Sequence, residues 1–236
     1  MCGRYVTPSQ SEIERLWHVG RHNLPDPFER RFNVSPTSLV PMLMRNDSGE
    51  LELKLARWGL IPGWWKNAKP PRNTFNARSE EAAGKPMWRQ PAGSARCLIP
   101  AVGWYEWQVV ERVDASTGEV STAKQPQFIH MPDGEAVGLA GLMSRWAPPG
   151  QDEHWSCAIL TRDAVGPAAE VHNRMPVALP RDIEAAWLDP KLRKGAEALD
   201  LARAKSITAF AHYPVDPRVN NARSEGPALI DQMSAH

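Results

Sequence analysis

The sequence predicts an α+β protein in a single domain of 236 residues, with a mixed, mainly antiparallel β core flanked by short helices. Three observations support this prediction. Alternating apolar residues and β-branched or aromatic runs fill the middle of the chain, and patterns typical of helices occur mainly near its ends. No low-complexity linker divides the chain, which is long enough to bury one sizeable core.

The N-terminal part is expected to form one helix and two strands. Residues 9–17 (SQSEIERLW) place a serine before acidic residues and collect apolar residues on one face, which predicts a short helix. Residues 39–44 and 51–58 have the composition of strands, and the turn-forming residues 46–49 join them. Residues 59–72 are rich in Gly, Pro, Trp and Lys, which predicts an irregular loop.

The middle of the chain supplies most of the expected sheet. The apolar run 96–107 (RCLIPAVGWYEW) predicts a central strand with a break at its proline or glycine. Residues 112–125 are polar and contain Thr117-Gly118, so they are interpreted as a hairpin insertion within the domain 1–236. Further strands are expected at residues 127–130, 136–146 and 156–161.

Two helices and one strand are expected near the C-terminus. A proline precedes residues 181–188, and a second helical pattern covers residues 193–204. A last strand around residues 207–213 leads into a proline-rich segment, and residues 227–236 are interpreted as a tail.

Composition narrows the class of protein. The net charge of +1 argues against a protein that coats nucleic acid through bulk electrostatics, yet 20 of the 28 basic residues are Arg, which suits forked recognition of phosphate. Three cysteines without a C-x-x-C motif argue against a structural zinc site or a disulfide scaffold, and no metal or cofactor is expected. Without an apolar run that could cross a bilayer or an N-terminal signal region, a cytoplasmic protein is expected.

The first candidate residue is Cys2, which follows the initiator methionine. Removal of Met1 would leave an exposed thiol and an α-amine on adjacent carbons. A free cysteine titrates at about pH 8.5 and an α-amine at about pH 8, so both are partly unprotonated at neutral pH. This pair can attack an aldehyde and close to a thiazolidine, or the thiolate could attack an amide. Taken alone, a cysteine at this position more often has no catalytic role.

The second candidate is Glu106, in the segment Gly103-Trp104-Tyr105-Glu106-Trp107. On a strand, Trp104 and Glu106 share one face, while Tyr105 and Trp107 share the other. Burial among aromatic side chains should raise the pKa of Glu106 toward the range useful for general acid–base catalysis. A solvent-facing Glu on a half-exposed strand is an equally good interpretation.

The third candidate is His172, in the segment Val171-His172-Asn173-Arg174-Met175-Pro176. It follows an irregular stretch and precedes a proline that stiffens the loop. A loop His beside Arg174 suits proton transfer near an anion, although a lone His is more often a surface residue without such a role.

The fourth candidate is a pair of polar residues, Asn76 and Arg78, which follow a loop that contains Trp64 and Trp65. The Asn76 amide can donate and accept, and Arg78 offers a forked cation two residues later. The same residues could instead cap a helix at residues 77–83. Most of the ten tryptophans are expected in the core, whereas this cationic loop is interpreted as an interaction surface.

Six motifs follow one another along the chain in a recognisable order. They are Met1-Cys2-Gly3-Arg4, Arg31-Phe32-Asn33-Val34-Ser35-Pro36, Trp58-Gly59-Leu60-Ile61-Pro62, Asn76-Ala77-Arg78-Ser79-Glu80, Gly103-Trp104-Tyr105-Glu106-Trp107 and His172-Asn173-Arg174-Met175-Pro176. This series resembles the SOS response-associated peptidase (SRAP) family. The resemblance extends from residue 2 to Gly226-Pro227 and so covers nearly the whole chain.

The resemblance implies a DNA damage response protein that senses abasic sites in single-stranded DNA and shields them in a covalent crosslink. In that family the N-terminal cysteine, exposed by methionine removal, forms a thiazolidine with the ring-opened aldehyde of the abasic sugar. The resemblance makes Cys2 the nucleophile, and it makes Asn76 the residue that holds the N-terminus or a sugar oxygen. Glu106 would handle the proton transfers of ring opening and imine formation, and His172 would assist at a sugar hydroxyl or a water.

The same resemblance implies a set of DNA contacts. Arg4 and Arg78 would grip phosphates beside the lesion, and Arg174 belongs to the same DNA-binding set. The residues that would stack on and kink the strand are Pro36, Trp64, Trp65 and Trp107, and Thr161 would add a backbone contact. The implied partner is single-stranded DNA with abasic sites, and no binding to a membrane is expected. A monomer with a DNA groove is the simplest expectation, and the protein is expected to lie at the bacterial nucleoid when bound to DNA. The sequence does not show which replication-fork proteins it meets.

Elementary chemistry fits these roles. An abasic sugar is mostly closed as a hemiacetal, so a crosslinking protein needs an acid–base group to open it and a nearby amine to trap the aldehyde. The missing base also leaves a gap that aromatic side chains can fill at a small cost in unstacking.

Two alternatives remain open at the level of sequence. One is a cysteine peptidase or amidohydrolase in which His172 is the base for Cys2, and this includes self-removal of the leading residue. It would need an oxyanion hole, for which the sequence has no signature. The other is a reader of single-stranded DNA without catalytic activity, whose binding would survive Cys2→Ala and leave no covalent product.

Overall fold

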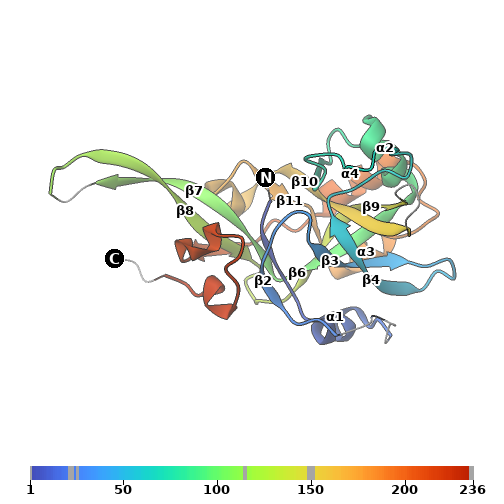
Figure 1. The fold of residues 1–236 in the computed structure, drawn as a ribbon, viewed down its shortest axis with the longest axis horizontal. Helices are drawn as coiled ribbons and strands as arrows, with labels where there is room; N and C mark the ends of the chain where they lie inside the picture. The colour runs from blue at the N-terminus through green and yellow to red at the C-terminus, as the bar shows by residue number, and fades with distance from the viewer. Residues whose placement is uncertain (1, 21–23, 25–26, 114–115, 148–151, 234–236) are drawn as a thin grey trace.

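The computed structural model describes residues 2–20, 24, 27–113, 116–147 and 152–233, which form two sheets and several short helices (Figure 1). Most neighbouring strands are antiparallel, and two pairings are parallel. The predicted α+β class with a mixed, mainly antiparallel β core is therefore confirmed.

The first sheet has five strands, and each pair of neighbours is antiparallel. Its order is β13 (Ala211–Pro214), β8 (Val120–His130), β7 (Gly103–Val113), β1 (Tyr5–Thr7) and β2 (Arg31–Val34). Strands β7 and β8 form one long hairpin whose outer part extends away from the body of the protein (Figure 1). The described residues of the segment 112–125, interpreted as an insertion, lie in this outer part.

The second sheet closes on itself. Its order is β11 (Arg174–Pro176), β10 (His154–Asp163), β4 (Leu51–Trp58), β3 (Leu39–Arg45), β6 (Arg96–Ala101), β9 (Val137–Trp146) and β12 (Ala178–Leu179). Because β9 pairs with both β6 and β10, the five central strands form a barrel-like ring. The short strand β5 (Asn76–Arg78) is not part of this order, and it pairs in parallel with β10.

Four α-helices cover the sheets in the described part of the chain. They are α1 (Gln10–Trp17), α2 (Pro86–Ser94), α3 (Arg181–Trp187) and α4 (Gly195–Lys205), and short 3₁₀ turns occur at η1 (Gly166–Glu170), η2 (Pro217–Asn220) and η3 (Pro227–Ile230). A capping box begins α1, in which Glu12 N–H donates to Ser9 and the Ser9 N–H donates to the Glu12 carboxylate. No helix in these described residues is long and apolar enough to span a membrane.

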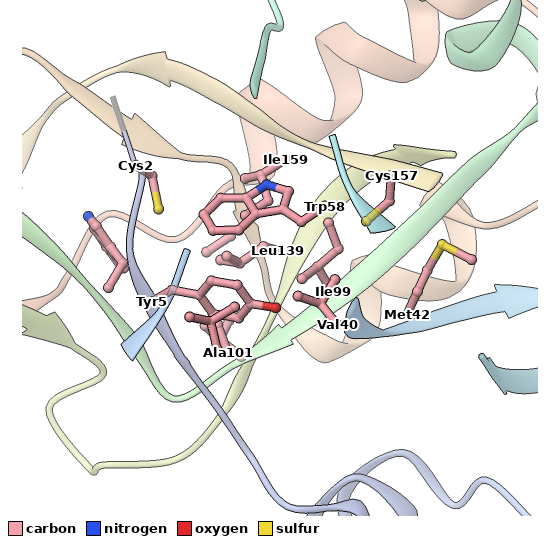
Figure 2. Close-up of a cluster of buried hydrophobic side chains, with 14 of the residues drawn as sticks. Cys2, Tyr5, Val40, Met42, Trp58, Ile99, Ala101, Leu139, Cys157 and Ile159 are labelled. Atoms are coloured by element: carbon pink, nitrogen blue, oxygen red, sulfur yellow. The ribbon is translucent and has the colours of Figure 1, made fainter. Parts of the chain in front are cut away.

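Alternation along the strands divides the core into layers. On β6, Cys97 and Ile99 belong to one buried cluster and Leu98 to another, because neighbouring side chains point to opposite faces. The first cluster also contains Tyr5 and Trp58, whose rings meet edge to face at 5.1 Å (Figure 2). The N-terminal strand is thereby anchored to the barrel-like ring by aromatic packing.

Several sequence predictions are confirmed and several need correction. The helix at 9–17, the strands at 39–44 and 51–58 and the helices at 181–188 and 193–204 are confirmed to within a few residues. The run 96–107 is divided at Val102 between strands of different sheets. The alternative helix at 77–83 is wrong, because residues 76–78 form β5.

Candidate functional site

The first strand brings the start of the chain to Glu106. Strand β1 is antiparallel to β7 with Tyr5 opposite Trp104, and the Tyr105 N–H donates to the Arg4 carbonyl at 2.9 Å. Continued along the same register, Gly3 would lie opposite Glu106. The electrostatic influence of Glu106 on the Cys2 thiol agrees with this placement.

Asn76 reaches the same place from the other sheet. It lies on β5, where it pairs with Ile159 of β10, and its amide Nδ2 donates to the Cys2 carbonyl at 2.8 Å. A side chain of the barrel-like sheet therefore holds the backbone of the N-terminal segment. Asn76 and Cys2, which are 74 residues apart in the chain, are thus in direct contact.

The Cys2 thiol is fully buried, which corrects the expectation of an exposed thiol. It belongs to the cluster that contains Tyr5 and Trp58 (Figure 2). Burial raises the pKa of the Cys2 thiol well above its usual value, and the negative charge of Glu106 raises it further, while the positive amino terminus opposes the shift. At neutral pH the sulfur is therefore a protonated thiol and not a thiolate.

Glu106 lies on β7 with only 3% of its surface exposed. Burial raises the pKa of its carboxyl from 4.5 to about 7, against the opposing effect of the positive amino terminus. The predicted shift toward the acid–base range is confirmed. At neutral pH the carboxyl can both accept and release a proton without a large cost in free energy.

His172 lies beside this carboxyl. It follows η1, and its Nε2 is 4.0 Å from Glu106 Oε2. Burial and the positive charges nearby, those of the amino terminus, Arg174 and Lys124, lower the pKa of His172. The ring is therefore mostly neutral at neutral pH.

A pocket of about 410 Å³ opens over these groups. Its lining residues are Glu106, Trp107, Lys124, His172 and Asn220, and the Trp107 indole donates to Asn220 Oδ1 at 2.6 Å. Two of these residues, Lys124 and Asn220, are not among the site residues that the sequence predicts. Asn220 occurs in the Val219-Asn220-Asn221 segment, which could have suggested it, whereas Lys124 reaches the pocket only through its pairing with Val109 in the hairpin.

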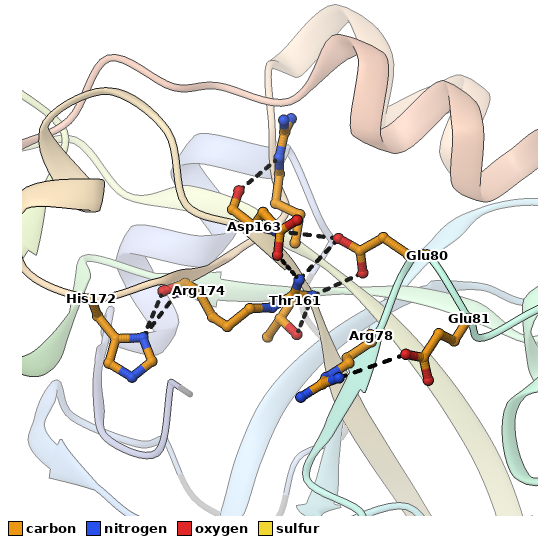
Figure 3. Close-up of polar contacts among 8 residues, drawn as sticks. Arg78, Glu80, Glu81, Thr161, Asp163, His172 and Arg174 are labelled. Atoms are coloured by element: carbon orange, nitrogen blue, oxygen red, sulfur yellow. Dashed lines mark hydrogen bonds and ion pairs between the residues drawn. The ribbon is translucent and has the colours of Figure 1, made fainter.

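The two arginines expected at phosphates differ in their surroundings. Arg78 is exposed, with 58% of its side chain accessible, and pairs with Glu81 at 3.6 Å (Figure 3). Arg4 is partly buried and donates to Asn33 Oδ1 at 2.8 Å and to the Val219 carbonyl at 2.9 Å. Arg78 is thus open to a ligand, whereas Arg4 also fastens β1 to the C-terminal segment.

Arg174 and Thr161 are buried side chains in a polar cluster whose Asp163 carboxylate is 83% exposed. The Arg174 guanidinium donates to both carboxylate oxygens of Glu80, at 3.0 and 2.8 Å, and pairs with Asp163 (Figure 3). It also lies 3.4 Å from Thr161 Oγ1, and Thr161 itself is fully buried. A phosphate could reach the Arg174 guanidinium only in competition with these two carboxylates.

Three of the four residues expected to stack, Pro36, Trp64 and Trp65, do not line the pocket at Glu106. Trp64 is 57% exposed, and its ring centroid is 5.9 Å from that of Trp65. Pro36 lines a second pocket of about 360 Å³ whose wall includes Arg57 and Arg72. Of the four residues expected to stack, only Trp107 lines the pocket at Glu106.

The described residues contain no group of three or more His, Cys, Asp and Glu side chains that could hold a metal ion. The groups that the described residues bring together at Cys2 and Glu106 include one thiol, one carboxyl, one imidazole and the amide of Asn76. These groups suit proton transfer beside an amine and a thiol.

Comparison with known proteins gives consistent matches over nearly the whole chain. A family model described as SOS response associated peptidase (SRAP) matches residues 1–222. The abasic site processing protein YoqW of Bacillus subtilis is 31% identical over 232 residues, which cover 98% of this chain and 99% of YoqW. The abasic site processing protein HMCES of Rattus norvegicus is 30% identical over 279 residues, which cover 98% of this chain and 75% of HMCES.

Two solved structures resemble the fold. A phage-related protein of Bordetella bronchiseptica is 33% identical, with a TM-score of 0.66 over 91% of this chain and 94% of that one. A protein of Bacteroides thetaiotaomicron has a TM-score of 0.80 over 99% of this chain and 100% of that one, and at 21% identity it supports the fold alone.

Proposed function

The chain belongs to the SOS response associated peptidase (SRAP) family, and from this premise we propose that it traps abasic sites in single-stranded DNA as a covalent thiazolidine crosslink through Cys2. Curated relatives that match nearly the whole chain are named abasic site processing proteins. The proposal requires removal of Met1, which turns the Cys2 nitrogen from an amide into an amine.

One observation carries the proposal. The Asn76 amide holds the Cys2 carbonyl at 2.8 Å beside a buried carboxyl whose pKa is about 7. The N-terminal nucleophile is thus held in place next to a group that can exchange protons at neutral pH.

The reaction begins with the sugar. The Glu106 carboxylate accepts the proton of the anomeric hydroxyl and passes it to O4′ as the C1′–O4′ bond breaks, so the hemiacetal opens to an aldehyde at C1′ and a 4′-hydroxyl. The α-amine of Cys2 adds to C1′, and one of its protons passes to the carbonyl oxygen to give a carbinolamine. The second amine proton passes through the Glu106 carboxylate to the hydroxyl of the carbinolamine, which departs as water. The product of this stage is an imine between the protein and the DNA.

The thiol closes the ring. Cys2 Sγ adds to the imine carbon, and the proton of the thiol passes to the imine nitrogen, which leaves a neutral five-membered thiazolidine. Overall, one amine, one thiol and one aldehyde combine with loss of one water. The raised pKa of the buried thiol favours this order, because an α-amine with a pKa of about 8 is the better nucleophile at neutral pH.

The DNA contacts belong to the same proposal. Arg78 and Lys124 supply exposed or pocket-lining cations, and Trp64 offers an exposed ring on which a base can stack. Arg4, Pro36, Trp65 and Trp107 complete the proposed binding surface, and Arg174 and the fully buried Thr161 lie behind it. The net charge of +1 agrees with binding through a local groove.

A peptidase mechanism fits the site less well. A thiolate nucleophile with His172 as base needs a low thiol pKa, and burial together with the Glu106 charge raises it. A reaction in which the amine attacks first and the thiol adds second does not require a low thiol pKa.

The proposal is tested with mature protein and single-stranded DNA that carries one abasic site. We expect a heat-stable adduct on a denaturing gel from the wild type and from Cys157→Ala, a matched control that removes another fully buried thiol. Cys2→Ala keeps the amine, so it should yield an adduct only when borohydride reduces the imine. A heat-stable adduct of Cys2→Ala without borohydride would contradict the proposal.

A further inference from the structure

Two of the sequence motifs meet at the Arg174 side chain. Glu80 belongs to the segment that follows β5, and Arg174 begins β11, which is paired with β10. The Glu80 carboxylate accepts two hydrogen bonds from Arg174 and a third, at 3.2 Å, from the Asp163 N–H. This ion-pair cluster of Glu80, Asp163 and Arg174 joins the segment that carries Asn76 to the segment that carries His172 (Figure 3).

The arrangement is well suited to hold Arg174 in one position. Its side chain is only 10% exposed, and a forked guanidinium that binds a carboxylate at both oxygens has little freedom to rotate. The charge of the buried guanidinium is balanced by two carboxylates, so the cluster avoids the cost of an unpaired buried charge.

The backbone of the same residue contacts the His172 ring. The Arg174 N–H donates to His172 Nδ1 at 3.0 Å, so this nitrogen presents its lone pair. The Arg174 carbonyl lies 3.3 Å from the same nitrogen and would favour a proton there, but the N–H contact is the shorter one. The backbone N–H of His172 donates to the Ala168 carbonyl at 3.1 Å, which holds the backbone of His172 in place.

We propose that the ion-pair cluster of Glu80, Asp163 and Arg174 positions His172 by holding the Arg174 N–H against Nδ1, so that the neutral ring carries its proton on Nε2, the nitrogen that faces Glu106. This inference rests on the proposed function. It makes Glu80 and Asp163 positioning residues, although neither lines the pocket.

The proposal gives His172 and Glu106 different roles in the pocket. A neutral His172 with its proton on Nε2 donates a hydrogen bond toward Glu106 or toward a sugar oxygen, and it does not act as a base at that atom. Glu106 is then the group that accepts protons. The described charged groups near the ring are Glu106 from β7, Lys124 from β8 and Arg174, and the two positive charges oppose a second proton on the ring.

Nuclear magnetic resonance of the DNA-free protein tests this directly. With ¹⁵N-labelled protein at a pH where the ring is neutral, we expect the Nδ1 resonance of an unprotonated nitrogen, that of a protonated nitrogen at Nε2, and a scalar coupling across the bond from the Arg174 amide to Nδ1. A proton on Nδ1 in the wild type would overturn the proposal.

Variants test the role of the cluster. In Glu80→Gln and in Glu80→Gln/Asp163→Asn we expect loss of the coupling and faster exchange of the Arg174 amide. Glu81→Gln is the matched control, because this neighbouring carboxylate pairs with Arg78 and Lys85 and not with Arg174. A coupling that persists in the double variant, or is lost equally in Glu81→Gln, would overturn the proposal.

Crosslinking kinetics supply the functional readout. The double variant should crosslink abasic DNA more slowly by on the order of tenfold, which is less than the roughly 10²–10⁴-fold that a positioned acid or base contributes, without weaker binding of intact single-stranded DNA. An unchanged rate with a lost coupling would overturn the positioning role. Failure of wild-type protein to crosslink would instead contradict the proposed function and leave the resonance result standing.

Discussion

At the scale of single residues, the environment of Glu106 decides what the site can do. The sequence places this Glu among aromatic residues. A buried carboxyl and a solvent-facing carboxyl fit that pattern equally well, because a strand pattern alone does not show which face of the strand is covered. In the structure Glu106 is only 3% exposed, and this burial raises the pKa of its carboxyl to about 7. In the proposed mechanism, the chemistry at Cys2 thus depends on a residue distant in the chain whose charge is set by burial.

Glu106→Gln should slow crosslinking by about 10²–10⁴-fold, because the amide keeps the shape of the side chain but neither accepts nor releases a proton. The wild-type rate should rise with pH through about 7 as the carboxylate forms, and the variant should lack this step. Single-turnover gel assays between pH 5.5 and 8.5, roughly a unit and a half on either side of that pKa, provide the measurement.

Glu184→Gln is the control for this experiment. Burial also raises the pKa of Glu184 to about 7, but this residue lies on α3, away from the pocket. If both variants lose activity to the same extent, the effect of Glu106→Gln is structural and the assignment of Glu106 as the proton-transfer group is wrong.

At the scale of elements, Glu184 links two helices. Its carboxylate accepts a hydrogen bond from the Trp17 indole at 2.9 Å, so it ties α3 to α1, and Arg181 lies over the Trp17 ring. Burial raises the pKa of Glu184 from 4.5 to about 7, against the Arg181 charge. The folded protein therefore keeps a proton that the unfolded chain releases.

This link should make stability depend on pH. Since the folded pKa exceeds the unfolded one, the contribution is fully present below about pH 4.5 and is lost as pH rises through about 7. The stability of the wild type relative to Glu184→Gln should fall by on the order of 3 kcal/mol over this range. Urea unfolding at both ends of this pH range measures the difference in stability, with Glu197→Gln, a substitution of an exposed carboxylate, as the control. An equal pH dependence of stability in the wild type and in Glu184→Gln would contradict the account.

The hairpin β7–β8 brings Lys124 to the pocket. Its register places Lys124 opposite Val109, further out along the ribbon than the pair of Glu106 and Gln127. Lys124→Gln should weaken binding of single-stranded DNA and reduce the slope of log affinity against log salt by about 0.7, the value for one phosphate contact. Salt titrations of the variant and of Lys205→Gln, a lysine of α4, make the comparison; equal slopes for the wild type and Lys124→Gln would remove Lys124 from the binding surface.

Elements with strong local signals could be predicted, and those that depend on distant partners could not. The helix α1 carries its cap and its apolar face within one segment. Strand β5 has three residues and exists through pairing with β10, so Asn76–Arg78 resembled a helix cap. Helix α2 contains Pro91 and Gly93, which argue against a helix, but Trp88 and Ala92 are buried against the core and offset that cost.

The candidate site divides in the same way. Cys2, Asn76, Glu106 and His172 could be named from motif order, and the structure brings them together. The surroundings of Arg174 could not be foreseen, because its two carboxylates come from residues 80 and 163 and meet it only in the folded chain. Burial of the Cys2 thiol is likewise a tertiary effect.

At the scale of the whole molecule, the site lies where the two sheets meet. Cys2 and Glu106 belong to the segments of the five-stranded sheet, whereas Asn76 and His172 are held by strands that pair with or follow β10. The hydrogen bond from Asn76 to Cys2 and the approach of His172 to Glu106 both cross this junction. Correct packing of one sheet on the other is therefore a condition for assembling the reactive groups.

The central claim is that the amine and the thiol of Cys2 both bond to one carbon of the abasic sugar. Intact mass spectrometry of the conjugate, before and after borohydride, tests it most directly. We expect the summed mass of Met1-free protein and abasic DNA less one water, unchanged by borohydride because a thiazolidine has no imine to reduce. A conjugate that gains two hydrogens on reduction, or that retains Met1, would contradict the account.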